Sequence, residues 1–469
     1  MARLFGTDGV RGIANVELTN EIAYRLGQAA VVFLGKTIIV GKDTRLSGDM
    51  LESAMVAGIT SAGGTALLAG VIPTPGIALL VRKLSAAGGA VISASHNPPE
   101  YNGIKLFDSF GYKLPDALED RIEAFINDGG LEGRTRTSAS DQSASDAAVD
   151  GAHDPSDEFA CMPCGSDLGF AVQLKDALDI YIDHAVDSIL SQDMDFKGMH
   201  IALDTGHGAS SLTSPAALRK LGAIVDVIND DFDGFDINVK CGSTHLEPLM
   251  DLMKKTGADL GIAHDGDADR VMMVSPTGRE IDGDIVEAVC AIDMKSRGVL
   301  KNNTVVSTVM CNLGFTHAMR DAGIEVVQTK VGDRYVLEEM RAKDYSIGGE
   351  QSGHMILLEH NSTGDGLMTA VQFIAAVKRS GKNVDEAIDV MKKYPQVLIN
   401  VRVSDKQAVS ESADVLAAVR TAEEELGENG RVLLRPSGTE PVVRVMVEAA
   451  TQADAERHAK AIAAIVEKI

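Results

Sequence analysis

The chain has 469 residues, too many for one hydrophobic core, so several domains of ordinary size are expected. Apolar residues make up 45% and charged residues 24% of the sequence, which is the balance of a folded globular protein and not of a disordered one. The formal net charge of -24 argues against nucleic acid or an anionic membrane as the main partner, because both are bound through basic surfaces.

The cysteine content and the N-terminal sequence predict a reduced, cytoplasmic protein. The five cysteines form no even disulfide framework. The N-terminal sequence MARLFGTDGV has no apolar signal core, and the chain contains no uninterrupted apolar run of about 18 residues. We therefore expect no membrane-spanning segment.

Residues 37–93 alternate between expected strands and helices. Strands are expected at 37–41, 65–70 and 89–93, and helices at 47–64 and 74–84. This alternation is typical of right-handed βαβ units, which form a mainly parallel sheet covered by helices on both faces. The run ends in the polar sequence SASHNP, residues 93–98.

The same pattern returns twice. Residues 199–264 again alternate and end in DGDADR, and residues 304–349 end in EQSGH. Ligands of parallel sheets bind beyond the carboxyl ends of the strands, where all three polar sequences fall. We therefore expect three domains to direct different polar loops toward a common space.

The C-terminal region has a different order of elements, with strands at 396–403, 431–435 and 441–449 and helices at 410–427 and 454–469. This order predicts a small α+β domain. A polar, glycine-containing stretch at 378–384 is the expected linker to it, and we expect this domain to move as a lid.

The predicted architecture is therefore three tandem α/β domains with mixed or parallel sheets and a C-terminal α+β domain around a central cleft. A serine-, alanine- and aspartate-rich segment is interpreted as a flexible acidic insertion. Its Cys161 and Cys164 have C-x-x-C spacing, but no second cysteine pair completes a zinc site. The expected bounds are 1–133, the insertion at 134–166, 167–265, 266–378 and 385–469.

The sequence DGDADR carries Asp265, Asp267 and Asp269 at every second position. Three crowded carboxylates repel one another unless a cation lies among them, and oxygen ligands suit a hard ion such as Mg²⁺. An EF-hand is excluded, because position 12 counted from Asp265 is Pro276. An acidic surface turn is the alternative.

The sequence SASHNP places Ser95 beside His96. A serine-hydrolase triad is not expected, because adjacent side chains point apart and the G-x-S-x-G motif is absent. A serine close to a carboxylate metal site fits phosphoryl transfer better, since the hydroxyl can accept and donate the phosphoryl group. A helix cap is the structural alternative.

Two further loops suit a sugar phosphate. The sequence RPSGTEP, residues 435–441, combines a fixed cation, two hydroxyls and a glycine that can converge on phosphate. The sequence GEQSGH, residues 349–354, brings a carboxylate and a hydroxyl that can hold sugar hydroxyls.

In this order and spacing, the four loops resemble those of the α-D-phosphohexomutase superfamily. The similarity runs from residue 1 to about 465 and omits 134–166. Within the superfamily, the segments that look most like bacterial phosphoglucosamine mutases are 5–12, 241–245, 330–336 and 348–366. Members that act on mannose or glucose phosphates tend to carry a histidine where this chain has Asp333.

The resemblance implies a role for each loop. Ser95 is expected to be a phosphoserine, with one Mg²⁺ per chain held by its phosphate and by Asp265, Asp267 and Asp269. Arg11 and Lys105 match positions of acid/base assistance, and Arg270 matches a position of the metal loop. The expected substrate ligands are Glu350, Ser352, Arg435, Ser437, Gly438 and Thr439. His245 is left open between loop packing and substrate contact.

The implied reaction is the interconversion of glucosamine 6-phosphate and glucosamine 1-phosphate through a 1,6-bisphosphate, for amino-sugar precursors of the cell wall. The alternatives are phosphomannomutase or phosphoglucomutase activity, a metal-dependent sugar phosphatase and a nonenzymatic sugar-phosphate binding protein. The oligomeric state stays open, with a homodimer as one alternative. One departure is DTGHGA at 204–209, where relatives usually have Asp-Cys-Ala-Asn-Gly-Ala; we interpret its His207 as structural.

Overall fold

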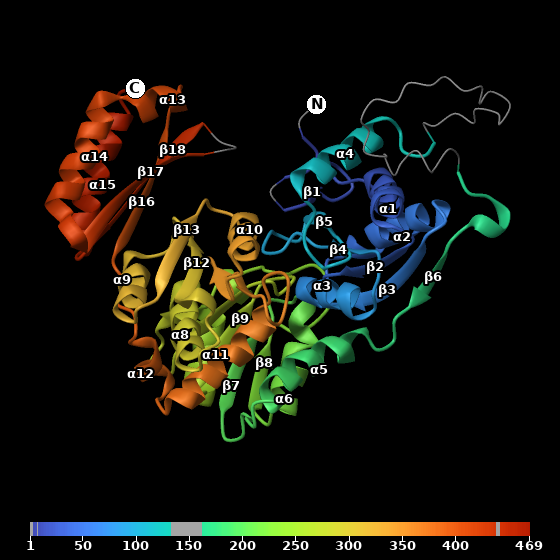
Figure 1. Cartoon of the computed structure of the whole chain (residues 1–469), viewed down its shortest axis with the longest axis horizontal. Coiled ribbons are helices and arrows are strands. Elements are labelled where there is room, and N and C mark those ends of the chain that lie inside the picture. Colours follow the sequence, from blue (N-terminus) through green and yellow to red (C-terminus); the bar gives the residue numbers. More distant parts are fainter. Residues whose placement is uncertain (1–2, 7, 133–161, 438–440) are drawn as a thin grey trace.

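The computed structural model describes residues 3–6, 8–132, 162–437 and 441–469. Within these residues the chain forms four sheets, which follow one another along the sequence (Figure 1). Their strand orders are β1-β5-β4-β2-β3-β6, β11-β10-β9-β7-β8, β13-β12-β14-β15 and β16-β18-β17. The predicted class, three α/β domains with mixed sheets and a C-terminal α+β domain, is confirmed.

The first domain is built on the parallel strands β4, β2 and β3; β4 is buried at every residue and β2 at four of its six, in keeping with their apolar sequence. Helices α1 and α2 pack closely because Gly58 has no side chain: a Cβ there would lie 1.9 Å from the carbonyl oxygen of Tyr24. The elements are β1 (Val10–Ile13), α1 (Asn20–Leu34), β2 (Thr37–Lys42), α2 (Gly48–Ser61), β3 (Thr65–Val71), α3 (Thr74–Lys83), β4 (Gly88–Ile92), β5 (Tyr101–Phe107) and α4 (Asp116–Asn127).

The second sheet extends beyond its predicted end. The chain turns back after β9, and the next strand pairs antiparallel with it, so the predicted boundary at 265/266 is wrong. A returning strand of this kind breaks the βαβ rhythm on which the boundary was based. The elements are α5 (Ala177–Leu190), β7 (His200–Asp204), α6 (Ser214–Lys220), β8 (Ile224–Ile228), α7 (Glu247–Thr256), β9 (Leu260–His264), β10 (Val271–Val274) and β11 (Glu280–Ile281).

The predicted start of the second domain, at residue 167, also differs from the structure. Strand β6 (Phe170–Gln173) pairs with β3 at the edge of the first sheet. All four of its residues are exposed, so its sequence carries no apolar alternation that would assign it to that sheet. Of the predicted insertion, Met162 packs against the first core and Pro163 approaches Gly63; residues 134–161, including Cys161, lie outside the described part of the chain.

The third sheet joins two parallel strands to an antiparallel hairpin. Helices α8 and α11 pack against each other, and α11 also packs against α5 of the preceding domain. The elements are α8 (Gly283–Ser296), β12 (Thr304–Thr308), α9 (Leu313–Asp321), β13 (Glu325–Thr329), α10 (Asp333–Lys343), β14 (Ile347–Gly349), β15 (Met355–Leu357), α11 (Gly366–Ser380) and α12 (Val384–Ile388).

The predicted linker at 378–384 is wrong. Helix α11 continues to Ser380, and α12 packs its Val384 and Ile388 into the core of the third domain. The chain therefore crosses to the C-terminal domain between α12 and β16. That domain contains β16 (Gln396–Arg402), α13 (Lys406–Glu411), α14 (Ala413–Leu426), β17 (Gly430–Pro436), β18 (Val442–Ala449) and α15 (Gln452–Val466); the single helix expected at 410–427 is divided at Ser412, which caps α14.

One large apolar core runs through the second and third domains and includes α3 of the first, whereas the C-terminal domain has its own core. A polar contact fastens that domain to α9. The fully buried Glu448 carboxylate accepts hydrogen bonds from Arg431 Nε (2.6 Å), Asn312 Nδ2 (3.1 Å) and the Leu313 amide (3.0 Å). The C-terminal domain is therefore anchored at one end.

Replacement of Glu448 by alanine is expected to lower the local unfolding free energy around α9 and β18 by about 2–4 kcal/mol. The reason is that Asn312 and Leu313 lose a buried acceptor, whereas Arg431 can still reach solvent. Native-state hydrogen exchange of β18 and of the first turn of α9 measures this value. The exposed Glu456→Ala, which breaks surface contacts with Lys460 and Gln452, is the matched control and is expected to change little. Equal hydrogen-exchange protection of β18 and α9 in both variants would contradict an anchoring role of Glu448.

No helix among the described residues is both long and apolar enough to cross a membrane.

Candidate active site

The Ser95 hydroxyl is presented by the turn that follows β4. Ser95 has a left-handed backbone conformation, with φ of 52°, and its carbonyl oxygen is held by Arg45 Nη2 (2.9 Å) and Asn238 Nδ2 (2.8 Å). Its amide donates to Ser93 Oγ (2.9 Å). This strained turn is fixed from two domains and directs the hydroxyl toward the second one.

Ser95 Oγ donates a 2.6 Å hydrogen bond to Asp265 Oδ2. The three aspartates of the following loop each offer an oxygen within 4.8 Å of the others, and all three are buried. Burial, together with the charges of Asp269 and Asp267, raises the pKa of Asp265 well above its usual value. The predicted approach of Ser95 to the aspartate loop is thus present, although the two sequences are 170 positions apart.

Donor chemistry and hydrogen bonding at this loop fit a hard divalent cation. Asp267 Oδ1 and Asp269 Oδ1 are buried and have no hydrogen-bond partner among the described residues. Carboxylate oxygens are the ligands that Mg²⁺ prefers. Asp265, Asp267 and Asp269 could therefore hold Mg²⁺, and an adjacent phosphate on Ser95 would add a further oxygen donor.

Lys105, on β5, supplies positive charge to the aspartate loop. Its Nζ lies 2.9 Å from Asp267, 3.0 Å from Asp8 and 3.4 Å from Asp269. Burial opposes its charge, but these carboxylates outweigh burial and hold the pKa of Lys105 well above its usual range. Lys105 is therefore an ammonium ion in this arrangement.

Arg11, on β1, donates to Asp8 and lies on the same side of the site. Burial, with the nearby guanidinium groups of Arg270 and Arg11, lowers the pKa of His96 to about 4. His96 is consequently neutral near pH 7. Arg11, Arg270 and Lys105 are further fixed cations of the site, in addition to Arg45, which donates to the Ser95 carbonyl oxygen.

The loop that contains Glu350 lies directly against the aspartate loop. Arg270 forms a β-bridge with His354, and the Val271 amide donates to the Gly353 carbonyl oxygen (3.1 Å). Glu350 Oε1 accepts from the Gly332 amide (3.1 Å), and Ser352 is exposed on the same loop. The structure thus brings together the aspartate loop and the loop that contains Glu350.

The remaining predicted ligands, those expected to hold the distant phosphate, lie in the C-terminal domain. Arg435 lies near the end of β17 and Ser437 directly after it, in the β17–β18 hairpin of the C-terminal domain (Figure 1). Arg435 faces Arg444 across the hairpin, and Lys406 Nζ donates to the Ser437 carbonyl oxygen (2.6 Å), so three cationic residues gather there. Gly438 and Thr439 lie outside the described residues. A cleft shared by all four loops remains a prediction.

His245 is exposed, and its Nδ1 lies 3.1 Å from Thr244 Oγ1. Its loop packs beside the end of β9: the Gly242 amide donates to Asp204 Oδ2 (3.0 Å), and a Cβ on Gly242 would meet the His264 carbonyl oxygen. This geometry explains the position of the loop and leaves a contact of His245 with substrate as a prediction.

Four family models describe this chain almost from end to end. They are phosphoglucomutase/phosphomannomutase α/β/α domain I over residues 2–132, domain II over 179–278, domain III over 282–394 and the C-terminal domain over 398–465. The chain belongs to the phosphohexomutase family.

Individual phosphohexomutases agree with this assignment. The chain is 48% identical to a phosphoglucosamine mutase of Clostridium novyi, over 100% of this chain and 99% of that one. Its fold is similar to a crystal structure of a phosphoglucomutase/phosphomannomutase family protein from Burkholderia thailandensis, with a TM-score of 0.76, 21% identity and 98% of each chain covered. It is also similar to Aspergillus fumigatus N-acetylphosphoglucosamine mutase in complex with GlcNAc-6P and magnesium, with a TM-score of 0.67 and 16% identity, covering 99% of this chain and 95% of that one.

Several residues of this phosphohexomutase site were missed by sequence reasoning. Lys113 bridges Asp8 of the first domain and Asp333 of the third, and Thr74 Oγ1 donates to Asp267 Oδ2 (2.6 Å). Asp333 was noted only as a departure from other family members. No spacing pattern links these positions, because Lys113 and Asp8 lie 105 residues apart and the other two pairs join different domains.

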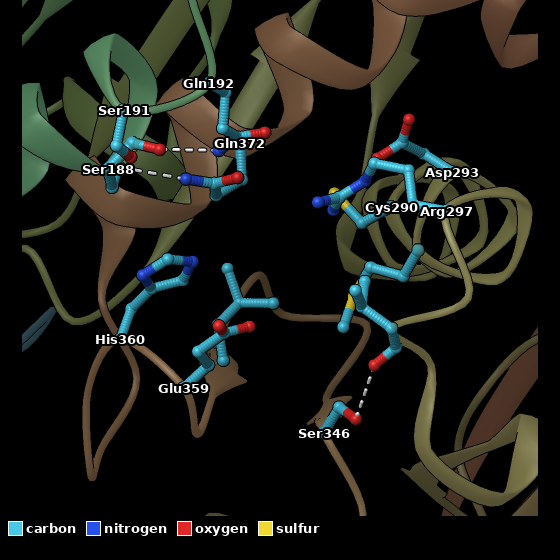
Figure 2. A pocket seen from close by; sticks show the side chains of 13 residues that line it. Ser188, Ser191, Gln192, Cys290, Asp293, Arg297, Ser346, Glu359, His360 and Gln372 are labelled. Atoms are coloured by element: carbon cyan, nitrogen blue, oxygen red, sulfur yellow. Dashed lines mark hydrogen bonds and ion pairs between the residues drawn. The ribbon is translucent and has the colours of Figure 1, made fainter.

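A separate cavity of about 190 Å³ lies among α5, α8 and α11 (Figure 2). Arg297, His360 and Gln372 line it, and Gln372 Nε2 donates to Ser188 Oγ (2.9 Å). None of the predicted site residues lines this cavity, so it is no part of the Ser95 site.

Proposed function

We propose that this phosphohexomutase interconverts glucosamine 6-phosphate and glucosamine 1-phosphate through a phosphoserine at position 95. The observation that best supports this proposal is the 2.6 Å hydrogen bond from Ser95 to Asp265, one of three buried carboxylates that lie close together. The phosphoglucosamine mutases that match this chain along its whole length supply the substrate class. Free thiols at Cys164, Cys241, Cys290 and Cys311 support a cytoplasmic location.

In the first half-reaction, the phosphorus–oxygen bond to Ser95 breaks, a bond from phosphorus to the C1 oxygen of glucosamine 6-phosphate forms, and the C1 hydroxyl proton ends on Ser95 Oγ. The 1,6-bisphosphate then turns around, Ser95 Oγ bonds to the 6-phosphorus as the bond to the 6-oxygen breaks, and the serine proton ends on that 6-oxygen. The Ser95 hydroxyl proton already points at Asp265 Oδ2, which is therefore placed to receive it as Ser95 attacks. The Lys105 ammonium and the Arg11 guanidinium supply positive charge beside the transferring group.

A site that accepts both orientations of the bisphosphate needs ligands near the middle of the sugar and an anchor for the distant phosphate. Glu350 and Ser352, next to the aspartate loop, suit the sugar hydroxyls. Arg435 and Ser437, with Gly438 and Thr439, suit the distant phosphate. Mg²⁺ bound by the three aspartates would neutralise phosphate oxygens.

Removal of divalent ions is expected to lower the mutase rate by about 100-fold or more, because the buried carboxylates then repel an incoming phosphate. The measurement compares chelator-treated protein before and after addition of Mg²⁺. When the same Mg²⁺ concentration is added back, Asp267→Asn is expected to regain a smaller fraction of the mutase rate than the wild-type protein does. Full activity of the chelated protein would contradict a metal role.

Loss of the Arg435 guanidinium is expected to raise KM for the sugar phosphate by about 10- to 100-fold, since a charged hydrogen bond to phosphate is lost. The comparison is Arg435→Met against Arg420→Met, an exposed position on α14 of the same domain. An unchanged KM in Arg435→Met would show that Arg435 of the β17–β18 hairpin does not bind the substrate.

The proposed activity is tested by supplying glucosamine 6-phosphate, glucose 6-phosphate and mannose 6-phosphate in parallel to the purified phosphorylated chain. The expected result is the fastest formation of the 1-phosphate from glucosamine 6-phosphate. Faster turnover of a neutral hexose phosphate would favour the phosphoglucomutase or phosphomannomutase alternative. Release of inorganic phosphate without isomerisation would indicate a phosphatase, and binding without turnover a nonenzymatic binding protein.

A further inference from the structure

The cavity of about 190 Å³ shown in Figure 2 lies between the second and third domains, apart from the Ser95 site. It is bounded by α5, α8 and α11 and by the turn that follows β15. A cavity of about 150 Å³ can hold benzene, so this one has room for about seven or eight non-hydrogen atoms. That is too few for a hexosamine phosphate, so a second copy of the proposed substrate does not fit it.

One wall of the cavity carries a positive charge that the protein neutralises only in part. Arg297 Nε donates to Asp293 Oδ2 (2.9 Å), and Arg379 holds the same carboxylate through Nε and Nη2, both at 2.7 Å. Two guanidinium groups therefore share one carboxylate. Among the described residues, the Arg297 side chain makes no other hydrogen bond, and it is 31% exposed, so a ligand can reach its two outer nitrogens. The planar fork of a guanidinium suits a carboxylate.

Glu359 places a negative charge on another wall. Figure 2 shows Arg297 and Asp293 on one side of the cavity, and Glu359 with His360 on the other. Glu359 forms no ion pair with any cationic side chain in the part of the chain that the structure describes. Burial lowers the pKa of His360 and raises that of Cys290 to about 12, so both are neutral near pH 7. The cavity therefore has one positive and one negative wall.

The rest of the lining is polar and neutral. Ser188, Ser191, Gln192 and Gln372 all face the cavity, and Gln372 Nε2 donates to Ser188 Oγ (2.9 Å). The Ser191 hydroxyl makes no hydrogen bond to the described residues, so it can pair with a ligand. Such groups suit a short polar side chain better than an apolar one. A ligand with a single charge would leave one of the two charged walls without a partner.

We propose that this cavity binds a small polar α-amino acid of about the size of serine. Its carboxylate would accept hydrogen bonds from the outer nitrogens of Arg297, and its ammonium would donate to the Glu359 carboxylate. Its side chain would face the neutral groups of α5 and α11. This site is independent of the proposed mutase activity, because none of its residues belongs to the Ser95 site.

Two helices that line the cavity begin directly behind loops of the Ser95 site. The Gly283 amide, at the start of α8, donates to the Gln351 carbonyl oxygen (3.0 Å) in the loop that contains Glu350. The Gly366 amide, at the start of α11, donates to the Ala268 carbonyl oxygen (3.0 Å) in the aspartate loop. An amino acid that joins α8, α5 and α11 would therefore restrain the helices on which both loops rest.

Calorimetric titration of the full chain with L-serine tests the ligand class. Wild type is expected to bind one L-serine per chain. Ethanolamine, which lacks the carboxylate, and 3-hydroxypropanoate, which lacks the ammonium, are each expected to bind at least about tenfold more weakly, because each loses a charged hydrogen bond. Equal affinity for the three compounds, or no binding of L-serine, would overturn the proposal.

Two variants locate the bound amino acid. Arg297→Met removes the guanidinium, and Glu359→Gln removes only a charge at an exposed position, so the second variant is expected to fold in any case. Each is expected to weaken L-serine binding by about tenfold or more. The matched controls, Arg320→Met and Glu338→Gln, change exposed side chains of the same domain and are expected to bind L-serine as wild type does.

Hydrogen exchange tests the effect of the bound amino acid on the two helices. L-serine at a saturating concentration is expected to slow amide exchange in α8 and α11 of wild type and of both controls, but not in Glu359→Gln at the same concentration. Wild-type affinity for L-serine in Arg297→Met and Glu359→Gln would assign the bound amino acid to another site and overturn the proposal. Unchanged exchange in α8 and α11 of serine-bound wild type would overturn it as well.

Discussion

Ser95→Ala is expected to lower the mutase rate by about 10⁴-fold or more and to remove the phosphoryl group from the isolated protein. The hydroxyl is the only group at this position that can carry phosphate between the two ends of the sugar, and its 2.6 Å hydrogen bond to Asp265 places it at the carboxylate trio. The rate is measured with glucosamine 6-phosphate, and the phosphoryl group by intact mass before and after phosphatase treatment.

The control for this experiment is Ser53→Ala. Ser53 lies exposed on α2, and its hydroxyl donates only to the Asp49 carbonyl oxygen of the same helix (2.7 Å). This variant is expected to keep both the rate and the phosphoryl group. Ser95→Ala is expected to fold, because Arg45 and Asn238 hold the backbone carbonyl of residue 95 and not its side chain. A folded Ser95→Ala protein with the full mutase rate would refute the phosphoserine mechanism.

The meeting of Ser95 and Asp265 could be predicted from sequence for a physical reason. Each residue follows a buried strand, β4 or β9, and polar side chains at the carboxyl ends of such strands lie at the ligand-binding edge of a sheet. The alternating aspartates predict a cation site, and the structure brings their oxygens within 4.8 Å of one another. Local periodicity also located β2, β3 and β4 with α2 and α3, because burial on a strand or helix face repeats regularly, but the buried helices α1, α8 and α11 and strand β5 were not predicted.

Contacts between domains could not be predicted in this way. Lys113 meets Asp333 across 220 positions, and Asn238 meets Ser95 across 143. Ser95 and Asn238 lie in turns, Lys113 in an isolated bridge and Asp333 at the first position of α10, so the sequence contains no local signal of their partners. The same limit explains the two boundary errors: β6 is exposed on both faces, and β10 returns antiparallel after a tight loop.

Lys105→Met is expected to have the second large effect, on stability and on metal affinity together. The Lys105 side chain is 1% exposed and stands between Asp8, Asp267 and Asp269. Removal of its ammonium leaves those carboxylates without their central cation, which is expected to lower the unfolding free energy of the metal-free chain by about 3–5 kcal/mol. Chemical denaturation in the presence of a chelator measures this loss.

The same substitution is expected to strengthen Mg²⁺ binding, because a positive charge next to the carboxylate trio no longer repels the ion. Calorimetric titration with Mg²⁺ separates this effect from general unfolding, since a merely damaged site would bind the ion more weakly. Lys255→Met, at an exposed position on α7, is the matched control and is expected to change neither quantity. The mutase rate of Lys105→Met is expected to fall by about 100-fold or more even when Mg²⁺ is saturating, because in the proposed mechanism the ammonium also supplies positive charge beside the transferring phosphoryl group. Weaker Mg²⁺ binding in a folded Lys105→Met protein would show that Lys105 builds the metal site and does not compete with the ion for its carboxylates.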